Sequence, residues 1–116
     1  MANITVTDQD VTVTLTAREK LAGLLGDLRV PHTQIRSVER LHDPVSAPRG
    51  IRAPGLALPG VIRVGTWRSR EHGRQYVVAR RGVPGVRLHL DGHRYREVIL
   101  SVADESVRER LVSVGH

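Results

Sequence analysis

Three residues near position 90 have the types and the spacing of a metal site. His89, Asp91 and His93 alternate with other residues, and alternate residues of a β-strand lie on one face of the strand. Imidazole and carboxylate groups are common ligands of divalent transition metals. The dipeptide Asp91-Gly92, however, is a strong signal for a tight hairpin turn, which places the two histidines on different strands. The simpler interpretation is an exposed hairpin tip, so the sequence predicts no bound metal and no cofactor.

A second pair, His42 and Asp43, has the residue types of an acid–base pair. The chain has no Gly-x-Ser-x-Gly nucleophile motif, no HExxH motif and no glycine-rich phosphate loop. Asp43-Pro44 is also a common way to begin a turn. The sequence therefore predicts no catalytic residue and a protein that is not an enzyme.

Period-2 alternation predicts the elements of the N-terminal third. Ile4 and Val6 alternate with threonines, as do Val11, Val13 and Leu15, which is typical of half-buried strands. Thr16 and Glu19 then have the spacing of a capping box, which predicts a short helix near residues 17–25. Residues 28–30 and 34–41 are expected to be extended, with Pro31 between them.

The C-terminal half predicts a run of antiparallel strands and a final helix. Four strands are expected, at about 61–68, 75–81, 85–90 and 95–102, and short connections favour antiparallel pairing of neighbours. Asp104 is suited to N-cap the last helix, whose apolar residues Val107, Leu111 and Val114 share one face. This helix must bury that face, so it is expected to cover an open end of the sheet.

Residues 42–60 are rich in proline and glycine and predict a long loop. Loops of this length in compact domains are often functional, and this one also carries apolar and arginine residues. These form a candidate interaction loop, namely Val45, Arg49, Ile51, Arg52, Leu56 and Leu58. The apolar members either pack beneath the loop itself or contact a partner.

Arginine dominates the charge of the chain. The 116 residues carry a net charge of +6, and Lys20 is the only lysine among 18 basic residues. The segment 61–96 alone has nine arginines against Glu71 and Asp91, which gives it a charge of +7. Such a segment attracts anionic partners, although a GC-rich genome also explains a high arginine content. Aromatic residues make up only 3%, so stacking surfaces for nucleic acid are scarce and nucleic acid is not an expected partner.

The predicted turns bring part of this charge to one end of the sheet. Consecutive hairpin turns lie at alternate ends, so the turns at 69–74 and 91–94 are expected together and the turn at 81–84 opposite them. The shared end would hold a candidate anion patch, consisting of Arg68, Arg70, Arg74, Arg94, His72 and His93. Guanidinium groups bind phosphate and carboxylate through their planar fork. The alternative is a solvated basic rim without a ligand.

Size and composition set the remaining limits. The length suits a single domain over 1–116. Cysteine is absent, which excludes disulfides and thiolate metal sites. The first residues have neither the basic run nor the apolar region of a leader, so none is expected, and no apolar run approaches the roughly 18 residues of a membrane span. The expected location is the cytoplasm.

Several motifs together resemble a bacterial pleckstrin-homology-like (PH-like) domain, as found in small single-domain proteins of actinobacteria. They are Glu19-Lys20-Leu21, the stretch Val30-Pro31-x-x-x-Ile35-x-Ser37-Val38-Glu39, the loop from Arg49 to Gly60 leading to Val64-Gly65-Thr66-Trp67, and Leu88-x-Leu90-x-Gly92-x-x-Tyr95 followed by Val98 to Asp104. The resemblance implies an antiparallel PH-like barrel or bent sheet capped by a C-terminal helix. It carries no known active site, so it implies no functional residue.

The sequence thus predicts a non-catalytic binding or scaffolding module. The first hypothesis is protein–protein interaction, including self-association, through the 44–60 loop or an open sheet edge. The second is binding of anionic ligands or membrane surfaces through the arginine-rich end.

Overall fold

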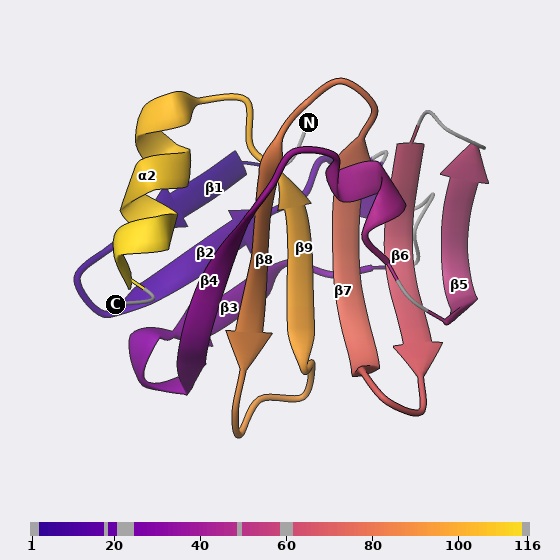
Figure 1. Ribbon diagram of the computed structural model, residues 1–116, viewed down its shortest axis with the longest axis horizontal. Helices are drawn as coiled ribbons and strands as arrows, with labels where there is room; N and C mark the ends of the chain where they lie inside the picture. The colour runs from indigo at the N-terminus through magenta and orange to yellow at the C-terminus, as the bar shows by residue number, and fades with distance from the viewer. Residues whose placement is uncertain (1–2, 18, 21–24, 49, 59–61, 115–116) are drawn as a thin grey trace.

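The computed structural model describes residues 3–17, 19–20, 25–48, 50–58 and 62–114. Within them the chain forms two β-sheets and a C-terminal helix (Figure 1). The smaller sheet has the strand order β1-β2-β3, with β1 (Asn3–Val6), β2 (Asp10–Thr14) and β3 (Leu28–Pro31). The larger sheet has the order β4-β8-β9-β7-β6-β5. Its strands are β4 (Ile35–Leu41), β5 (Ile51–Leu58), β6 (Ile62–Ser69), β7 (Gly73–Arg80), β8 (Gly85–Leu90) and β9 (Glu97–Ser101).

The smaller sheet follows the predicted alternation. Val11 and Val13 of β2 are buried, while Thr14 is exposed and Thr12 is partly exposed. After β2, the capping box is present: the amide of Glu19 donates to Thr16 Oγ1 at 3.2 Å, and the amide of Thr16 donates to Glu19 Oε1 at 3.0 Å. Residues 17, 19 and 20 are helical, and 21–24 of the predicted helix lie outside the described residues.

The segment that connects β2 and β3 of the smaller sheet is anchored to the larger sheet. The Tyr76 hydroxyl of β7 donates to the carbonyl oxygen of Gly26 at 2.8 Å, and Leu25 lies in the core at 5% exposure. Burial raises the pKa of Tyr76 well above its usual value. The hydroxyl therefore stays protonated and keeps donating to the Gly26 carbonyl at neutral pH.

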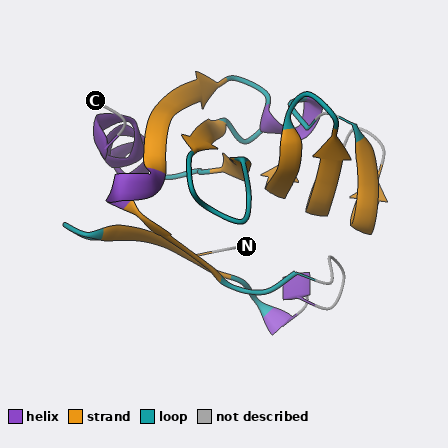
Figure 2. Ribbon diagram, turned by 90° about the horizontal axis from the view of Figure 1, so that it is seen from below, coloured by secondary structure: helices purple, strands orange, loops and turns teal. Residues whose placement is uncertain are grey.

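The core lies between the two sheets. Figure 2 shows the smaller sheet as a separate layer along one face of the larger sheet, which we call the inner face. Tyr76 and Val78 of β7 pack there with residues of the smaller sheet, while their neighbours Val77 and Ala79 face the opposite, outer side. Period-2 alternation thus gives β7 two buried faces.

The C-terminal helix α2 (Glu105–Val114) closes one side of the core. Asp104 caps it as predicted, because its Oδ1 accepts hydrogen bonds from the amides of Ser106 and Val107 at 2.9 and 3.3 Å. Leu111 is fully buried, and Val107 is partly buried against the core. The prediction of a mainly β protein with a C-terminal helix is confirmed. The described strands form two sheets and not a closed barrel.

The predicted loop at 42–60 is wrong in part, because it contains a strand. The short 3-10 helix η2 (Pro44–Ser46) is followed by β5, which pairs antiparallel with β6. A register shift between Arg52 and Gly55 accommodates Pro54. Proline lacks a backbone donor and is tolerated in edge strands and bulges, so its presence did not exclude a strand.

The pairing of neighbouring strands is also wrong at one place. β7 and β8 are joined by a short turn, but they are not neighbours, because β9 lies between them (Figure 1). β9 runs parallel to β7 and antiparallel to β8. The other pairings in both sheets are antiparallel, as predicted.

Candidate functional site

The outer face of the larger sheet carries a buried ion network that joins three neighbouring strands. Arg87 of β8 is 5% exposed and Glu97 of β9 is 6% exposed. Arg87 Nη1 lies 3.1 Å from Glu39 Oε1 of β4, and Arg87 Nη2 donates to the carbonyl oxygen of Ala47 at 3.0 Å. The Arg87 guanidinium therefore ties β8 to β4 and to the segment that follows η2.

The pairing of Arg87 with Glu97 is close but not fully hydrogen-bonded. Arg87 Nε and Glu97 Oε1 are 3.1 Å apart, yet the N–H is not directed at the oxygen, so both buried atoms lack a hydrogen bond. Charge attraction holds the pair, and some hydrogen-bonding capacity of each group is unused. Buried groups of this kind are costly to desolvate.

Two histidines extend the network at either end. His89 Nε2 lies 3.3 Å from Glu39 Oε1, and His72 Nδ1 lies 3.5 Å from Glu97 Oε2. His72 Nε2 is also 3.7 Å from Glu71 Oε2. Burial raises the pKa of Glu39, but hydrogen bonds from His89 and Arg87 outweigh burial and hold this pKa below its usual value. Glu39 is therefore ionised at neutral pH.

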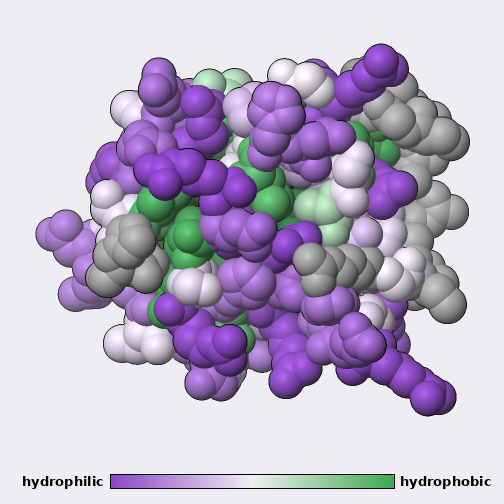
Figure 3. All heavy atoms as spheres, viewed as in Figure 1, coloured by the Kyte–Doolittle hydropathy of each residue, from purple (hydrophilic) through white to green (hydrophobic). Residues whose placement is uncertain are grey.

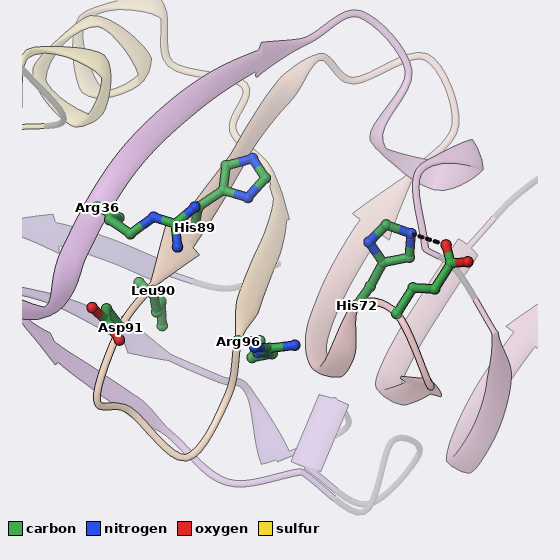
Figure 4. Close-up of a pocket in the computed structure, with 7 residues that line it drawn as sticks. Arg36, His72, His89, Leu90, Asp91 and Arg96 are labelled. Atoms are coloured by element: carbon green, nitrogen blue, oxygen red, sulfur yellow. Dashed lines mark ion pairs between the residues drawn. The ribbon is translucent and has the colours of Figure 1, made fainter.

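A hollow of about 260 Å³ lies beside this network, and we call it the sheet-face hollow. Leu90 is its apolar residue, and its polar and charged residues are Arg36, Glu71, His72, His89, Asp91 and Arg96. Figure 4 shows Arg36 and His89 on one side, His72 on the other, and Arg96 between them. The face of the molecule seen in Figure 3 is dominated by hydrophilic side chains. The hollow suits a polar ligand.

The strand ends are arranged as the sequence predicts. The β6–β7 turn and the β8–β9 turn lie at one end of the larger sheet, and the β7–β8 turn lies at the other (Figure 1). Arg68 and Arg74 are directly opposed in the β6–β7 register. Arg70 is exposed in the turn. Three of the predicted arginines therefore belong to one hairpin.

The other members of the candidate anion patch have different surroundings. His72 faces the carboxylates of Glu97 and Glu71 on the outer face, whereas Arg74 shares the inner-facing side of β7 with Tyr76. Both ring nitrogens of His93 are occupied: Nε2 bonds the carbonyl oxygen of Arg29, and Nδ1 accepts from the Tyr95 amide. Arg94 lies over the ring of Tyr95. The six residues share an end of the sheet but not a face.

The six residues of the candidate interaction loop lie in different parts of the structure. Val45 is buried at 5% and packs with Trp67, Val77 and Ile99 on the outer face. That member therefore packs on the protein's own core. Four others, Ile51, Arg52, Leu56 and Leu58, belong to β5, and Arg49 lies outside the described residues.

The other residues weighed from the sequence serve local structure. Asp43 accepts from the Ser46 hydroxyl at 2.7 Å at the start of η2, as a turn initiator would. His89 contacts Glu39 and His93 contacts Arg29, so these two histidines bind different strands. No group of three metal-ligating side chains occurs within the described part of the chain.

Sequence patterns did not single out Arg36 and Arg96, which line the hollow, or Glu39 and Glu97 of the adjoining ion network. Arg36 and Glu39 lie in the stretch used for the family resemblance, and Arg96 and Glu97 lie where the β8–β9 turn meets β9. Their proximity depends on the strand order β4-β8-β9, which places distant segments side by side. A signal that points to this region is the alternation of Arg87 and His89 with apolar residues in the strand at 85–90, which places two polar side chains on one face of the sheet.

Comparison with protein-family models, with curated proteins and with solved structures finds no match. The resemblance to PH-like domains therefore remains a prediction. No helix formed by the described residues is long and apolar enough to cross a membrane.

Proposed function

We propose that the protein is a non-catalytic binding module that adds an extended segment of a protein partner to the free edge of β5. An open strand edge presents unpaired backbone N–H and C=O groups and binds extended peptides by strand addition. The observation that carries the proposal is the contrast between β5 and the other edge strands.

Each of the other three edge strands is contacted by another described part of the chain. Helix α2 packs beside β4, with Arg40 Nη2 at 2.6 Å from Glu109 Oε1. It also packs beside β1, where Arg110 Nη2 donates to the carbonyl oxygen of Val6 at 2.6 Å. The β8–β9 turn reaches β3, where His93 bonds the carbonyl of Arg29. These contacts occupy polar groups or block access at each edge.

β5 differs, because no described segment lies beyond it. It occupies one end of the strand order, and Figures 1 and 2 both show it at the limit of the larger sheet. Pro54 and the register shift beside it interrupt the strand. The run Gly55–Leu58 continues in register with β6 after this interruption. A partner segment therefore has at least this run to pair with.

Charge favours an acidic partner over a second copy of the chain. β5, β6 and β7 contain five arginines and no acidic residue, namely Arg52, Arg63, Arg68, Arg74 and Arg80. None of the four arginines of β6 and β7 has a carboxylate within 4.0 Å in the described part of the chain. Two such edges would repel, whereas an acidic segment would be attracted.

The finer fold assignment belongs to the same proposal. A bent sheet with a C-terminal helix packed on its core supports a PH-like domain, and the parallel β7–β9 pair and separate sheets depart from an antiparallel barrel. The proposed function depends on the free β5 edge and not on the family assignment.

The test is hydrogen exchange on the purified protein bound to a partner captured from its source cells. We expect slowed exchange at the amides of 51–58, and release of the partner as salt screens the arginines. Slowed exchange confined to another edge would contradict the proposal.

A matched pair of charge reversals sharpens the experiment. Arg52→Glu places a negative charge on β5 and should weaken the complex. Arg81→Glu makes the same change in the exposed β7–β8 turn, at the opposite end of the sheet from the β6–β7 turn, and should leave binding within about twofold because salt screens distant charges. If both variants weakened the complex equally, the net charge of the protein alone would explain the loss, and this would contradict strand addition at β5.

A further inference from the structure

We infer that the sheet-face hollow is a binding site for a small anion with phosphate or carboxylate groups, held by Arg36 and Arg96. This site is separate from the β5 edge. It also differs from the patch predicted from the sequence, because neither arginine belonged to that set.

The two arginines approach the hollow from different segments. Arg36 lies on β4, and Arg96 precedes β9 at the end of the β8–β9 turn. Both side chains are exposed, and within the described residues neither has a carboxylate within 4.0 Å. Both line the same hollow, in which Figure 4 shows Arg96 between Arg36 and His72. Unpaired guanidinium groups offer forked donors that match phosphate and carboxylate oxygens.

The position of Arg96 is fixed by the backbone around it. Its amide donates to the carbonyl oxygen of Arg74 at 2.8 Å, and its carbonyl accepts from the Leu90 amide at 2.8 Å. Its aliphatic stem crosses Gly73, where an added Cβ would lie 3.0 Å from Arg96 Cγ and closer still to Cδ. Gly73 also has a φ of +67°. The glycine therefore leaves room for the arginine stem, and a preordered side chain loses less entropy on binding.

The two histidines complete the polar lining. His72 and His89 each have one ring nitrogen beside a carboxylate of the network, Glu97 Oε2 and Glu39 Oε1 respectively. These carboxylates, held in turn by Arg87, orient the rings at the wall of the hollow. The buried network thus acts as a frame for the lining, which gives a reason for charges at positions where apolar residues would stabilise the sheet more simply.

The acidic residues of the lining favour a free anion over an anionic group on a membrane surface. Glu71 has a side chain that is 86% exposed, and Asp91 is exposed at the tip of the β8–β9 turn. Both would repel a flat anionic membrane that approached this side. A compact ion needs only the forked donors of Arg36 and Arg96, whereas a membrane surface must also approach both carboxylates. The geometry therefore favours a free anion over a lipid headgroup in a bilayer.

The experiment is a calorimetric titration with inorganic pyrophosphate at constant ionic strength. We expect saturable binding at one site, and at least about a tenfold loss of affinity in Arg36→Gln/Arg96→Gln, because the variant loses the charge-assisted hydrogen bonds of both guanidinium groups. Both side chains are exposed, so the variant should keep the thermal stability of the wild type. The absence of saturable binding by the wild type would overturn the proposal.

A second variant separates the hollow from the general charge of this end. Arg68→Gln/Arg70→Gln removes the same charge from two exposed arginines outside the lining and should bind pyrophosphate within about twofold of wild type, because salt screens distant charges. Equal loss in the two variants would show a diffuse basic rim and overturn the site. Vesicles of phosphatidylglycerol form the last arm, and binding to them without binding to pyrophosphate would equally contradict a site for a free anion.

Discussion

Charged side chains in the middle of a sheet are the residue-scale feature that sequence patterns misjudged. In the strand at 85–90, Val86, Leu88 and Leu90 alternate with Arg87 and His89, and the three apolar residues lie in the core on the inner face. Such alternation is typical of a strand whose polar face is solvated, yet Arg87 is not. It is buried because the segment around η2 covers that part of the outer face, and the Ala47 carbonyl accepts from its guanidinium. The alternation of residues within one strand cannot reveal that Ala47, 40 residues earlier in the chain, covers Arg87.

The Arg87–Glu97 pair should behave as a coupled unit. Arg87→Met leaves the Glu97 carboxylate buried without its cation, and breaking a buried pair from one side costs about 3–5 kcal/mol. Adding Glu97→Gln removes the stranded charge, so the double variant should recover a substantial part of that loss. Urea denaturation measured by the fluorescence of Trp67, the one tryptophan, gives the free energies of unfolding. A single variant that loses less than about 1 kcal/mol would mean that the pair is solvated.

Among the elements, the sequence predicted the positions of the turns correctly, but it did not predict the order of the strands in the larger sheet. Asp91-Gly92 does mark the turn between two paired strands, β8 and β9, and Gly92 has a φ of +79°. The short turn at 81–84 suggested that β7 and β8 pair, but β9 lies between them. The end of β9 satisfies that turn: the Ser101 hydroxyl bonds the carbonyls of Arg80 and Val83, and the Val102 amide donates to Pro84. These contacts join distant residues, so a single-sequence pattern could not reveal them.

Two glycines in this region should respond differently to alanine. A Cβ at Gly85 would collide with the backbone carbonyl of Leu100 on β9, which cannot rotate away. We therefore expect Gly85→Ala to cost about 3 kcal/mol or more, at the upper end of overpacking effects. Gly82 has a φ of +79° but open space around it, so Gly82→Ala should cost only the left-handed strain of about 1–2 kcal/mol. Thermal denaturation of both variants tests the strand order, and a smaller loss for Gly85→Ala than for Gly82→Ala would contradict it.

At four places in the molecule, an acidic side chain makes a contact that holds a strand, a connection or a helix end in position. Asp10 pairs with Arg29 across the smaller sheet, Asp27 accepts from the Leu15 amide, and Glu109 of α2 pairs with Arg40 of β4. Asp104 caps α2. The chain has 12 acidic residues and a net charge of +6, so protonating these four would also raise its net positive charge.

Stability should therefore fall in acid. Hydrogen bonds lower the pKa of each of these groups, from Arg29 for Asp10, the Leu15 amide for Asp27, Ser106 for Asp104 and Arg40 for Glu109. The usual values are 3.8 for aspartate and 4.5 for glutamate. A folded-state pKa below the unfolded one stabilises the protein fully above the unfolded value, and that stabilisation is lost as the pH falls through the folded value. We expect the contribution of these groups to be constant from pH 7 to about pH 5, and to decline below about pH 4.

Urea denaturation at fixed ionic strength between pH 7 and pH 3 measures this decline. Asp104→Asn is the matched variant, because asparagine also caps helices but does not titrate. Its free energy of unfolding should fall less steeply below pH 4 than that of the wild type, while both fall. A wild-type free energy that stays constant from pH 5 to pH 3 would mean that these carboxylates contribute equally whether ionised or protonated. The contacts of Asp10 and Asp27 within the smaller sheet, and of Glu109 between α2 and β4, would then not be the charge-assisted ones that the geometry indicates.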